Sequence, residues 1–340
     1  MKRIFLIVFN ILLLFCFSCS SIKDKEDNQA SYIGNDTSVN VEFENTMEFE
    51  KYISGKIYTL NKIKEQNNIG LSFAFLTDLH WQSNLKKSPI WLKRICDEVA
   101  IDKVVLGGDY VDYDYEDVSI PKKIICDVSN AFSLFNYVGI VGNHDSNNNS
   151  YQGTPRIPDS EIFSLINNKS YEHPYYAEFF ESSKVCNLYL NSSIDSFDDK
   201  KQETFIFDTL KNLDESWSVL FFIHIMFDGM YQNNNLSVIR PAGLQFLNYV
   251  KSILPYLKCN IIGVFSGHSH LDYLNVTDYC IPCITTMCDA LGMYNHNYNI
   301  YKRESNSSTG QAFDIVQIDL TAKKVFLTRI GAGSDRTYTY

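Results

Sequence analysis

Five short apolar runs between residues 71 and 265 constrain the fold of this 340-residue chain more than any other feature of its sequence. They are LSFAFL (71–76), KVVL (103–106), YVGIV (137–141), VLFFI (219–223) and IIGVF (261–265). Apolar residues do not alternate with polar ones in these runs, as they would in a strand with one face in water. We therefore expect central parallel strands that are covered by helices on both sides.

Segments with helical periodicity lie between these runs. SPIWLKRICDEVA (88–100) is predicted to be a helix, with Ser88 as its N-cap and Pro89 at its first helical position. Its apolar residues then recur at spacings of three and four, which is typical of a helix with one buried face. PAGLQFLNYVKSIL (241–254) has a similar pattern and is predicted to be a second helix.

The pattern changes near the carboxyl end of the chain. FDIVQIDL (313–320) and KVFLTRIGAG (324–333) are predicted to be antiparallel strands joined by a short turn. Alternating strands and helices followed by such strands predict an α/β domain with two packed sheets.

The amino-terminal residues have the features of an export signal. Lys2 and Arg3 precede IFLIVFNILLLFCF, which is too short to span a membrane comfortably, so residues 1–18 are predicted to be a cleaved signal peptide. The following FCFSCSS resembles a bacterial lipoprotein site with Cys19 as the lipidated residue. Residues 19–65 would then be a tether and a short helical or strand lead-in. We expect a lipid-anchored protein of the bacterial periplasm or outer membrane; the alternative is secretion without lipid.

Each apolar run ends in residues that can bind metal ions. They are Asp78 and His80 after the first run, Asp109 after the second, Asn143, His144 and Asp145 after the third, His224 after the fourth, and His268 and His270 after the fifth. Because the carboxyl ends of parallel strands share an edge of a sheet, these side chains are expected to meet. Only two of the seven histidines, His173 and His296, lie elsewhere.

The residue types at these positions favour transition metals. Carboxylates, an amide oxygen and imidazoles, without a thiolate, suit Mn, Fe, Co, Ni or Zn. Two carboxylates, one amide and four imidazoles make seven side chains. Seven are too many for one ion and are about right for two ions that share a bridging carboxylate.

The ordered series Asp-x-His, Gly-Asp, Gly-Asn-His-Asp, His and Gly-His-x-His resembles the calcineurin-like metallophosphoesterase superfamily over roughly residues 70–335. The resemblance implies a four-layer αββα sandwich, in which two mixed sheets are flanked by helices. It also implies two divalent metal ions at the strand ends. The implied ligands are Asp78, His80 and His270 for the first ion, Asn143, His224 and His268 for the second, and Asp109 as the bridge.

The implied activity is hydrolysis of phosphomonoester or phosphodiester bonds in a small substrate. A hydroxide activated by the two metal ions would attack phosphorus. His144, which is not among the ligands, resembles the general acid that protonates the departing oxygen. Asp112 has the spacing of the carboxylate that orients this histidine in the protein-phosphatase branch; the alternative is a solvated residue of the acidic loop DYVDYDYED. For Asp145 the alternative is a cap of its own turn.

Two other functions stay open. Some relatives of this fold are non-catalytic interaction modules, but they typically lack the acid histidine or several ligands, and this chain retains them all. A metal-binding or carbohydrate-binding lipoprotein could use surface aromatic residues, although aromatic side chains are mostly core. His296 is a candidate for the pocket mouth, whereas His173 has no partner motif and is predicted to be structural. The formal charge of −10 disfavours a nucleic-acid partner, and no protein partner is implied.

Overall fold

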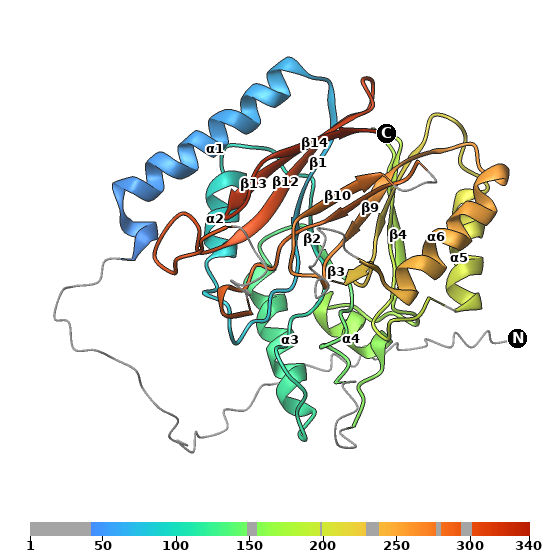
Figure 1. The fold of residues 1–340 in the computed structure, drawn as a ribbon, viewed down its shortest axis with the longest axis horizontal. Helices are drawn as coiled ribbons and strands as arrows, with labels where there is room; N and C mark the ends of the chain where they lie inside the picture. Colours follow the sequence, from blue (N-terminus) through green and yellow to red (C-terminus); the bar gives the residue numbers. More distant parts are fainter. Residues whose placement is uncertain (1–41, 148–154, 198, 229–237, 277–279, 294–300) are drawn as a thin grey trace, which may run out of the picture. The chain divides into compact units, whose positions relative to one another are not determined.

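Two six-stranded sheets pack face to face in the computed structural model, and helices cover the outer face of each (Figure 1). The structure describes residues 42–147, 155–197, 199–228, 238–276, 280–293 and 301–340. The predicted signal peptide, Cys19, most of the predicted tether and His296 lie outside these residues.

The first sheet has the strand order β14-β13-β12-β1-β2-β3. Its strands are β1 (Ile69–Leu76), β2 (Lys103–Leu106), β3 (Tyr137–Gly139), β12 (Ala312–Asp319), β13 (Lys324–Gly331) and β14 (Arg336–Thr339). Strands β1, β2 and β3 are parallel, whereas β12 pairs antiparallel with β1 and β13, and β13 with β14. The predicted antiparallel pair near the carboxyl end is therefore confirmed as β12 and β13.

The second sheet has the order β10-β11-β9-β6-β5-β4. Its strands are β4 (Tyr176–Phe180), β5 (Val185–Tyr189), β6 (Ser218–Phe222), β9 (Asn260–Ser266), β10 (Tyr273–Val276) and β11 (Pro282–Thr285). The four central strands are parallel, and the two edge strands β4 and β10 are antiparallel to their neighbours. Strands β7 (Phe227–Asp228) and β8 (Val238–Ile239) form a separate short pair.

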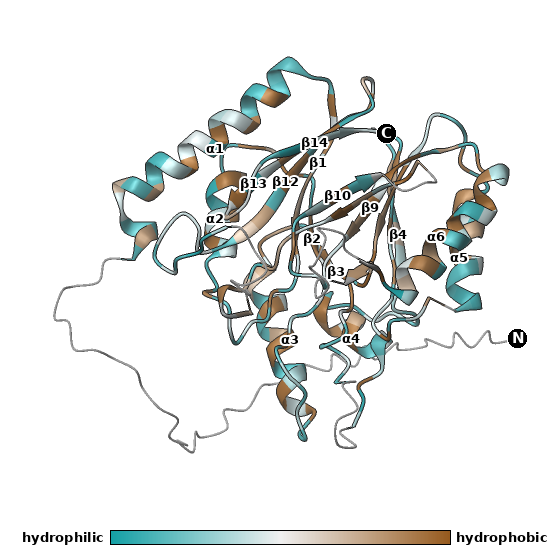
Figure 2. Ribbon diagram, viewed as in Figure 1, coloured by the Kyte–Doolittle hydropathy of each residue, from teal (hydrophilic) through white to brown (hydrophobic). Residues whose placement is uncertain are grey.

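The helices form the outer layers. Those of the first sheet are α1 (Met47–Gln66), α2 (Ser88–Cys96), α3 (Ser119–Phe132) and α4 (Asp159–Ile166), and those of the second are α5 (Lys200–Leu210) and α6 (Pro241–Ile253). The described residues also form three short 3-10 helices: η1 (Phe43–Asn45) precedes α1, η2 (Leu254–Tyr256) directly follows α6, and η3 (Leu291–Met293) follows β11. The strands are largely hydrophobic, while the helices carry both hydrophobic and hydrophilic residues (Figure 2). The predicted four-layer sandwich with two mixed sheets is confirmed.

Aromatic rings hold the two sheets together. Phe73 of β1 lies edge-on to Phe222 of β6 and Phe265 of β9, with ring centroids 5.4 and 5.2 Å apart. Such pairs contribute about 0.5–1.5 kcal/mol each beyond their buried area. The inner faces of both sheets are therefore apolar, which explains why the five runs lack alternation.

Helix α1 extends the core beyond the predicted domain start. The Thr46 hydroxyl caps it by accepting from the Phe49 N–H at 3.1 Å. Its buried residues Phe49, Ile53, Ile57 and Leu60 recur at spacings of three and four. The lead-in was predicted to be short, but this helix has 20 residues and packs into the core of the first sheet.

Two expectations need correction. The argument that all five runs share one sheet edge was wrong, because β1, β2 and β3 belong to one sheet and β6 and β9 to the other. Ser88 is not the N-cap of α2: the cap is Lys87, without a side-chain hydrogen bond. The Ser88 hydroxyl instead donates to the buried carboxylate of Asp289 at 2.7 Å.

Among the described residues, no helix is both long and apolar enough to cross a membrane.

Candidate metal centre

The loops that follow strands β1, β2, β3, β6 and β9 meet at the end of the sandwich where these strands finish. They bring together two groups of side chains whose donor atoms lie within 4.8 Å of one another. The first group is Asp78, His80, Asp109 and His270, and the second is Asp109, His224 and His268. Asp109 belongs to both groups, so it occupies the position expected of a bridging carboxylate.

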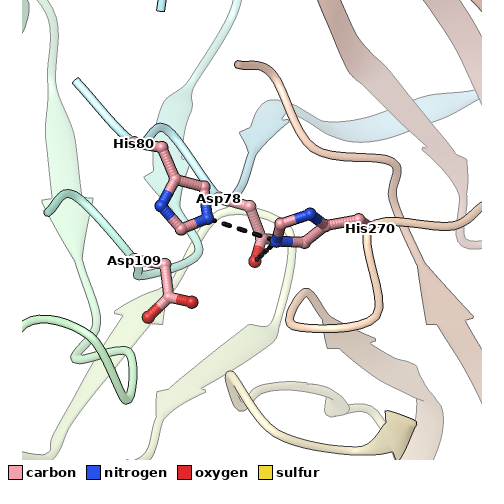
Figure 3. Close-up of side chains that lie close together, drawn as sticks. All are labelled: Asp78, His80, Asp109 and His270. Carbon is pink, nitrogen blue, oxygen red and sulfur yellow. Dashed lines mark hydrogen bonds and ion pairs between the residues drawn. The ribbon is translucent and has the colours of Figure 1, made fainter. Parts of the chain in front are cut away.

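The first group draws residues from both sheets (Figure 3). His80 Nε2 lies 3.2 Å from His270 Nε2, which in turn lies 3.3 Å from Asp78 Oδ1. Asp78 and His80 follow β1 of the first sheet, whereas His270 follows β9 of the second. The first group therefore forms only if the two sheets are held in a defined relative position.

The second group also includes Asn143. Its Oδ1 lies 3.1 Å from His224 Nε2 and 2.8 Å from His268 Nδ1. His224 Nε2 lies 3.1 Å from Asp109 Oδ2. All seven side chains expected to be ligands are thus brought together, while their role as ligands stays a prediction.

Backbone carbonyls orient three of the four imidazoles. The Nδ1 atoms of His80, His224 and His270 donate to the carbonyls of Val111, Gly107 and Met293 at 3.1, 2.7 and 3.2 Å. A proton fixed on Nδ1 leaves the Nε2 lone pair free to face the centre, which is the usual arrangement around metal-binding histidines. Side-chain patterns carry no sign of these carbonyls, so the sequence did not predict them.

This arrangement fits a cation. With their Nδ1 protons held by carbonyls, His80 and His270 point their Nε2 atoms at each other across 3.2 Å. Two lone pairs this close repel each other unless a proton or a metal ion lies between them and the neighbouring carboxylates. Nitrogen and oxygen donors in this proportion suit divalent transition metals.

Left-handed backbone conformations are concentrated in the centre. Twelve non-glycine residues in the described part of the chain have positive φ. Five of them are predicted ligands: Asp78 (51°), His80 (35°), Asp109 (53°), His268 (67°) and His270 (56°). Asp and His tolerate this conformation better than most residues, and strained backbone gathers at functional sites because the surrounding structure must enforce it.

Two motif glycines allow the loops to approach closely. A Cβ on Gly267 would lie 1.9 Å from Thr77 Oγ1 and 2.5 Å from Asp78 Oδ2. A Cβ on Gly142 would lie 2.2 Å from the Asp109 amide nitrogen. The glycines of Gly-His-x-His and Gly-Asn-His are therefore explained by contact between loops.

Two imidazoles in the centre favour the protonated form. Burial works against the charge on His224, but Asp109 and Asp78 outweigh it and raise its pKa to about 9. Burial also opposes the charge on His270, yet Cys288 and Asp78 raise its pKa well above the usual value.

The other two imidazoles favour the neutral form. Burial lowers the pKa of His80 to about 3 and that of His268 to about 4, and a neighbouring imidazole contributes in each case. Despite burial, the positive neighbours His270 and His224 lower the pKa values of Asp78 and Asp109 respectively. Without metal, the centre thus balances two carboxylates with two imidazolium groups.

Comparison with known protein families shows which family has this sequence pattern. Residues 71–272 match the model of the calcineurin-like phosphoesterase family. The chain belongs to this family. The match ends two residues after His270, so it contains every predicted ligand of the candidate metal centre. No curated protein matches the chain in sequence.

The chain is also similar to solved structures of low sequence identity. A dimetal phosphatase from Danio rerio has 12% sequence identity and a TM-score of 0.55, and the alignment covers 80% of this chain and 99% of that one. A calcineurin-like phosphoesterase from Bacillus subtilis has 12% identity and a TM-score of 0.38, with coverage of 79% and 90%. The phosphopantetheinyl hydrolase from Mycobacterium tuberculosis has 12% identity and a TM-score of 0.35, with coverage of 64% and 89%. At this identity, the likeness to the first shows the fold alone.

His144 lies at the edge of the candidate metal centre. Its Nε2 is 3.9 Å from Asp109 Oδ2, and its ring lies edge-on to His80 with centroids 5.2 Å apart. Its side chain is 23% exposed, so solvent reaches it. Its Nδ1 is buried and has no hydrogen-bond partner among the described residues.

Asp112 is not the solvated loop residue of the alternative prediction, because it is 0% exposed. Its Oδ2 accepts from the Ser83 hydroxyl, and its backbone N–H donates to Gln82 Oε1 at 3.2 Å. Its Oδ1 is buried and, within the part of the chain that the structure describes, accepts no hydrogen bond. The predicted hydrogen bond between Asp112 and His144 is therefore not formed here, although each retains an unused buried atom.

Asp145 does more than cap its own turn. It accepts from the Gly142 N–H at 2.7 Å, as a turn cap would, and also from the N–H groups of Asp109 and Tyr110 at 3.0 and 2.6 Å. The carboxylate thereby fastens the loop after β3 to the loop after β2. Burial, followed by the negative charge of Asp109, raises its pKa to about 7.

The remaining predicted position with a described structure is His173. It lies on the surface with its ring stacked on Tyr175 at a centroid distance of 5.1 Å, and it belongs to neither group of donor atoms.

Proposed function

We propose that this family member hydrolyses phosphomonoester or phosphodiester bonds of a small substrate at a dinuclear metal centre. One observation carries the proposal: two groups of nitrogen and oxygen donors share the buried carboxylate of Asp109. Sites of this kind suit a phosphate group, which places negative charge on several oxygens at once.

The residues that would hold the metals follow from the two groups. One ion would be held by Asp78, His80 and His270, the other by Asn143, His224 and His268, with Asp109 between them. When bound, two divalent transition-metal ions would neutralise the phosphate and supply a nucleophile from water at neutral pH. The carbonyls that hold three imidazole Nδ1 protons keep the free ring nitrogens directed inward.

His144 would supply the proton for the leaving oxygen. Its imidazole lies beside the centre, is partly exposed and is not needed as a ligand. Its Nε2 is the ring atom that lies near Asp109. Proton donation by a positioned histidine contributes about 10²–10⁴-fold to the rate. A module that only binds a partner has no need of such a donor, which favours catalysis over the non-catalytic alternative.

Asp112 would orient His144 once a substrate is bound. Ser83 holds one oxygen of Asp112, which leaves the other oxygen free to accept from a protonated Nδ1 of His144. Hydrogen bonds in catalytic groups often tighten only in the complex with substrate.

The test is turnover of p-nitrophenyl phosphate and bis(p-nitrophenyl) phosphate by the domain after chelation and reloading with Mn²⁺ or Zn²⁺. We expect metal-dependent turnover of at least one ester. Asp109→Asn should abolish it, whereas Asp208→Asn, an exposed carboxylate on α5, should leave it unchanged. Absence of turnover with every metal across a wider panel of phosphoesters would refute the proposal.

We further propose that the protein is exported and anchored to a membrane through lipid on Cys19. The support is sequence alone: a basic start, a short apolar stretch and a small residue before the cysteine. Radiolabelled palmitate incorporation that is lost in Cys19→Ala would support this anchor, and release of the unmodified wild type into the medium would contradict it.

A further inference from the structure

We infer that Arg329, which lies beyond the region matched by the family model, is a positioning residue that holds His270 in the metal centre. The inference rests on the proposed dinuclear centre and adds a role for the carboxyl-terminal strands. Arg329 is on β13 of the first sheet and is 0% exposed. It reaches across to the loop of the second sheet that carries His270.

The guanidinium group of Arg329 uses all five of its N–H donors. Nε and Nη2 donate to Asp314 Oδ1 and Oδ2 at 2.9 and 3.1 Å. Nη1 and Nη2 donate to Asp272 Oδ2 and Oδ1 at 2.9 and 2.5 Å. The remaining Nη1 proton goes to the Ala332 carbonyl at 2.8 Å. Two bidentate carboxylates on one guanidinium leave it a single orientation.

These contacts join the two sheets. Asp314 and Arg329 belong to β12 and β13 of the first sheet, whereas Asp272 lies in the loop between β9 and β10 of the second. Asp272 comes two residues after His270, so its position limits where the His270 backbone can lie. It also accepts from the Met287 N–H at 3.0 Å, which ties this loop to the segment after β11.

Arg336 of β14 reinforces the junction. Its Nη1 donates to the Thr285 carbonyl at 2.8 Å, and its Nη2 donates to Asp314 Oδ2. The Thr286 hydroxyl donates to the same oxygen at 2.6 Å. We define the Arg329 junction as these four charged residues: Asp272, Asp314, Arg329 and Arg336.

The junction bears mainly on the first group of ligands. That group takes three residues from the first sheet and only His270 from the second. His224 of the second group has its own link between the sheets, because its Nδ1 donates directly to the Gly107 carbonyl at 2.7 Å. Loss of the junction should therefore weaken one metal site more than the other.

Stability alone does not account for this junction. A buried ion pair adds little net stability compared with apolar residues of similar volume, since desolvation offsets the attraction. What it supplies is a fixed geometry, and displaced supporting contacts around a metal site typically cost 10–100-fold in affinity.

The chain offers a matched control at the other end of the sheets. Lys103, at the first residue of β2, forms an ion pair of 2.8 Å with Glu178 of β4, and Lys103 is 7% exposed. This pair also joins the two sheets, but Asp109 follows the opposite end of β2. Lys103→Met thus removes a buried contact between the sheets without touching the centre.

The experiment is calorimetric titration of the metal-free domain with Mn²⁺, with thermal unfolding measured in parallel. Arg329→Lys keeps the charge but offers three donors in place of five, so it cannot bind both carboxylates bidentately. We expect one of the two binding steps to weaken by about 10-fold or more. The step should be the one lost in His270→Gln, and the other should change by less than about threefold. Lys103→Met should lower the unfolding temperature and leave both steps unchanged.

Arg329→Lys that binds two ions with wild-type affinity would overturn the inference. So would a loss of affinity in Lys103→Met of the same size. If Arg329→Lys fails to fold, Asp272→Asn provides the same comparison, because it keeps the size of the side chain and replaces one of the two oxygens that accept from Arg329 with an NH2 donor. A wild-type domain that binds fewer than two ions would instead refute the proposed centre itself, so the two failures are distinguishable.

Discussion

Metal loading of the centre should release about two protons per protein near pH 7.5. In the metal-free centre, the pKa of His224 is about 9 and that of His270 is well above the usual value. Each of these two rings therefore carries an extra proton, in addition to the one that a neutral imidazole has. His80 and His268, with pKa values of about 3 and 4, hold no extra proton. An imidazole must be neutral to bind a metal ion, so both extra protons must leave.

The number of protons released on metal binding depends on pH. A pKa of about 9 leaves about 97% of His224 protonated at pH 7.5 and about half of it at pH 9. The contribution of His224 to proton release should therefore fall from about 1 to about 0.5 between these two pH values. Any proton lost from a metal-bound water adds to both numbers.

The assay is isothermal titration calorimetry in buffers of equal pH and different ionisation enthalpy. The slope of observed enthalpy against buffer enthalpy gives the number of protons. His173→Gln, which removes a surface histidine that belongs to neither group of donor atoms, should leave the slope unchanged. A slope near zero at pH 7.5 with two ions bound would refute the assignment of protonated imidazoles.

Three other predictions follow from the same geometry. The folded-state pKa of His224 is raised from 6.5 to about 9, so its contribution to stability is present below pH 6.5 and is lost as pH rises through 9. Loss of this contribution alone should lower the unfolding free energy of the metal-free protein by about 2.5 kcal/mol from pH 7 to pH 10 in urea titrations, and by less in the metal-loaded protein. His144→Ala should slow esters with poor leaving groups by about 10²–10⁴-fold and p-nitrophenyl esters far less; equal slowing would remove its role as acid. Gly267→Ala should cost about 1–3 kcal/mol of stability through its clash with Thr77 and Asp78, and should lower the metal content measured by plasma emission; wild-type content would contradict the close-contact argument.

Much of the fold was predictable because local patterns and long-range packing agree. The run KVVL coincides with β2, and the other four runs match β1, β3, β6 and β9 to within two residues at each end. Strands buried on both faces must be apolar throughout, so their sequences alone mark them. The division of these strands between two sheets was not predictable in this way, because both sheets impose the same pattern.

The side chains of the candidate site were predictable from the sequence, whereas the backbone carbonyls and ion pairs that hold them in position were not. Asp78, Asp109 and the histidines stand out because their types and positions after strands are visible in the sequence. The carbonyls of Val111 and Gly107 are invisible there, since every residue has one. Contacts such as that of Arg329 with Asp272 join positions 57 residues apart, and no local pattern couples them.

Anomalous diffraction at the manganese edge from crystals of the Mn²⁺-loaded domain tests the central claim most directly. The account predicts two peaks of comparable height. One should contact Asp78, His80, Asp109 and His270, and the other should contact Asp109, Asn143, His224 and His268. A single peak at full loading, or peaks that do not share Asp109, would contradict it.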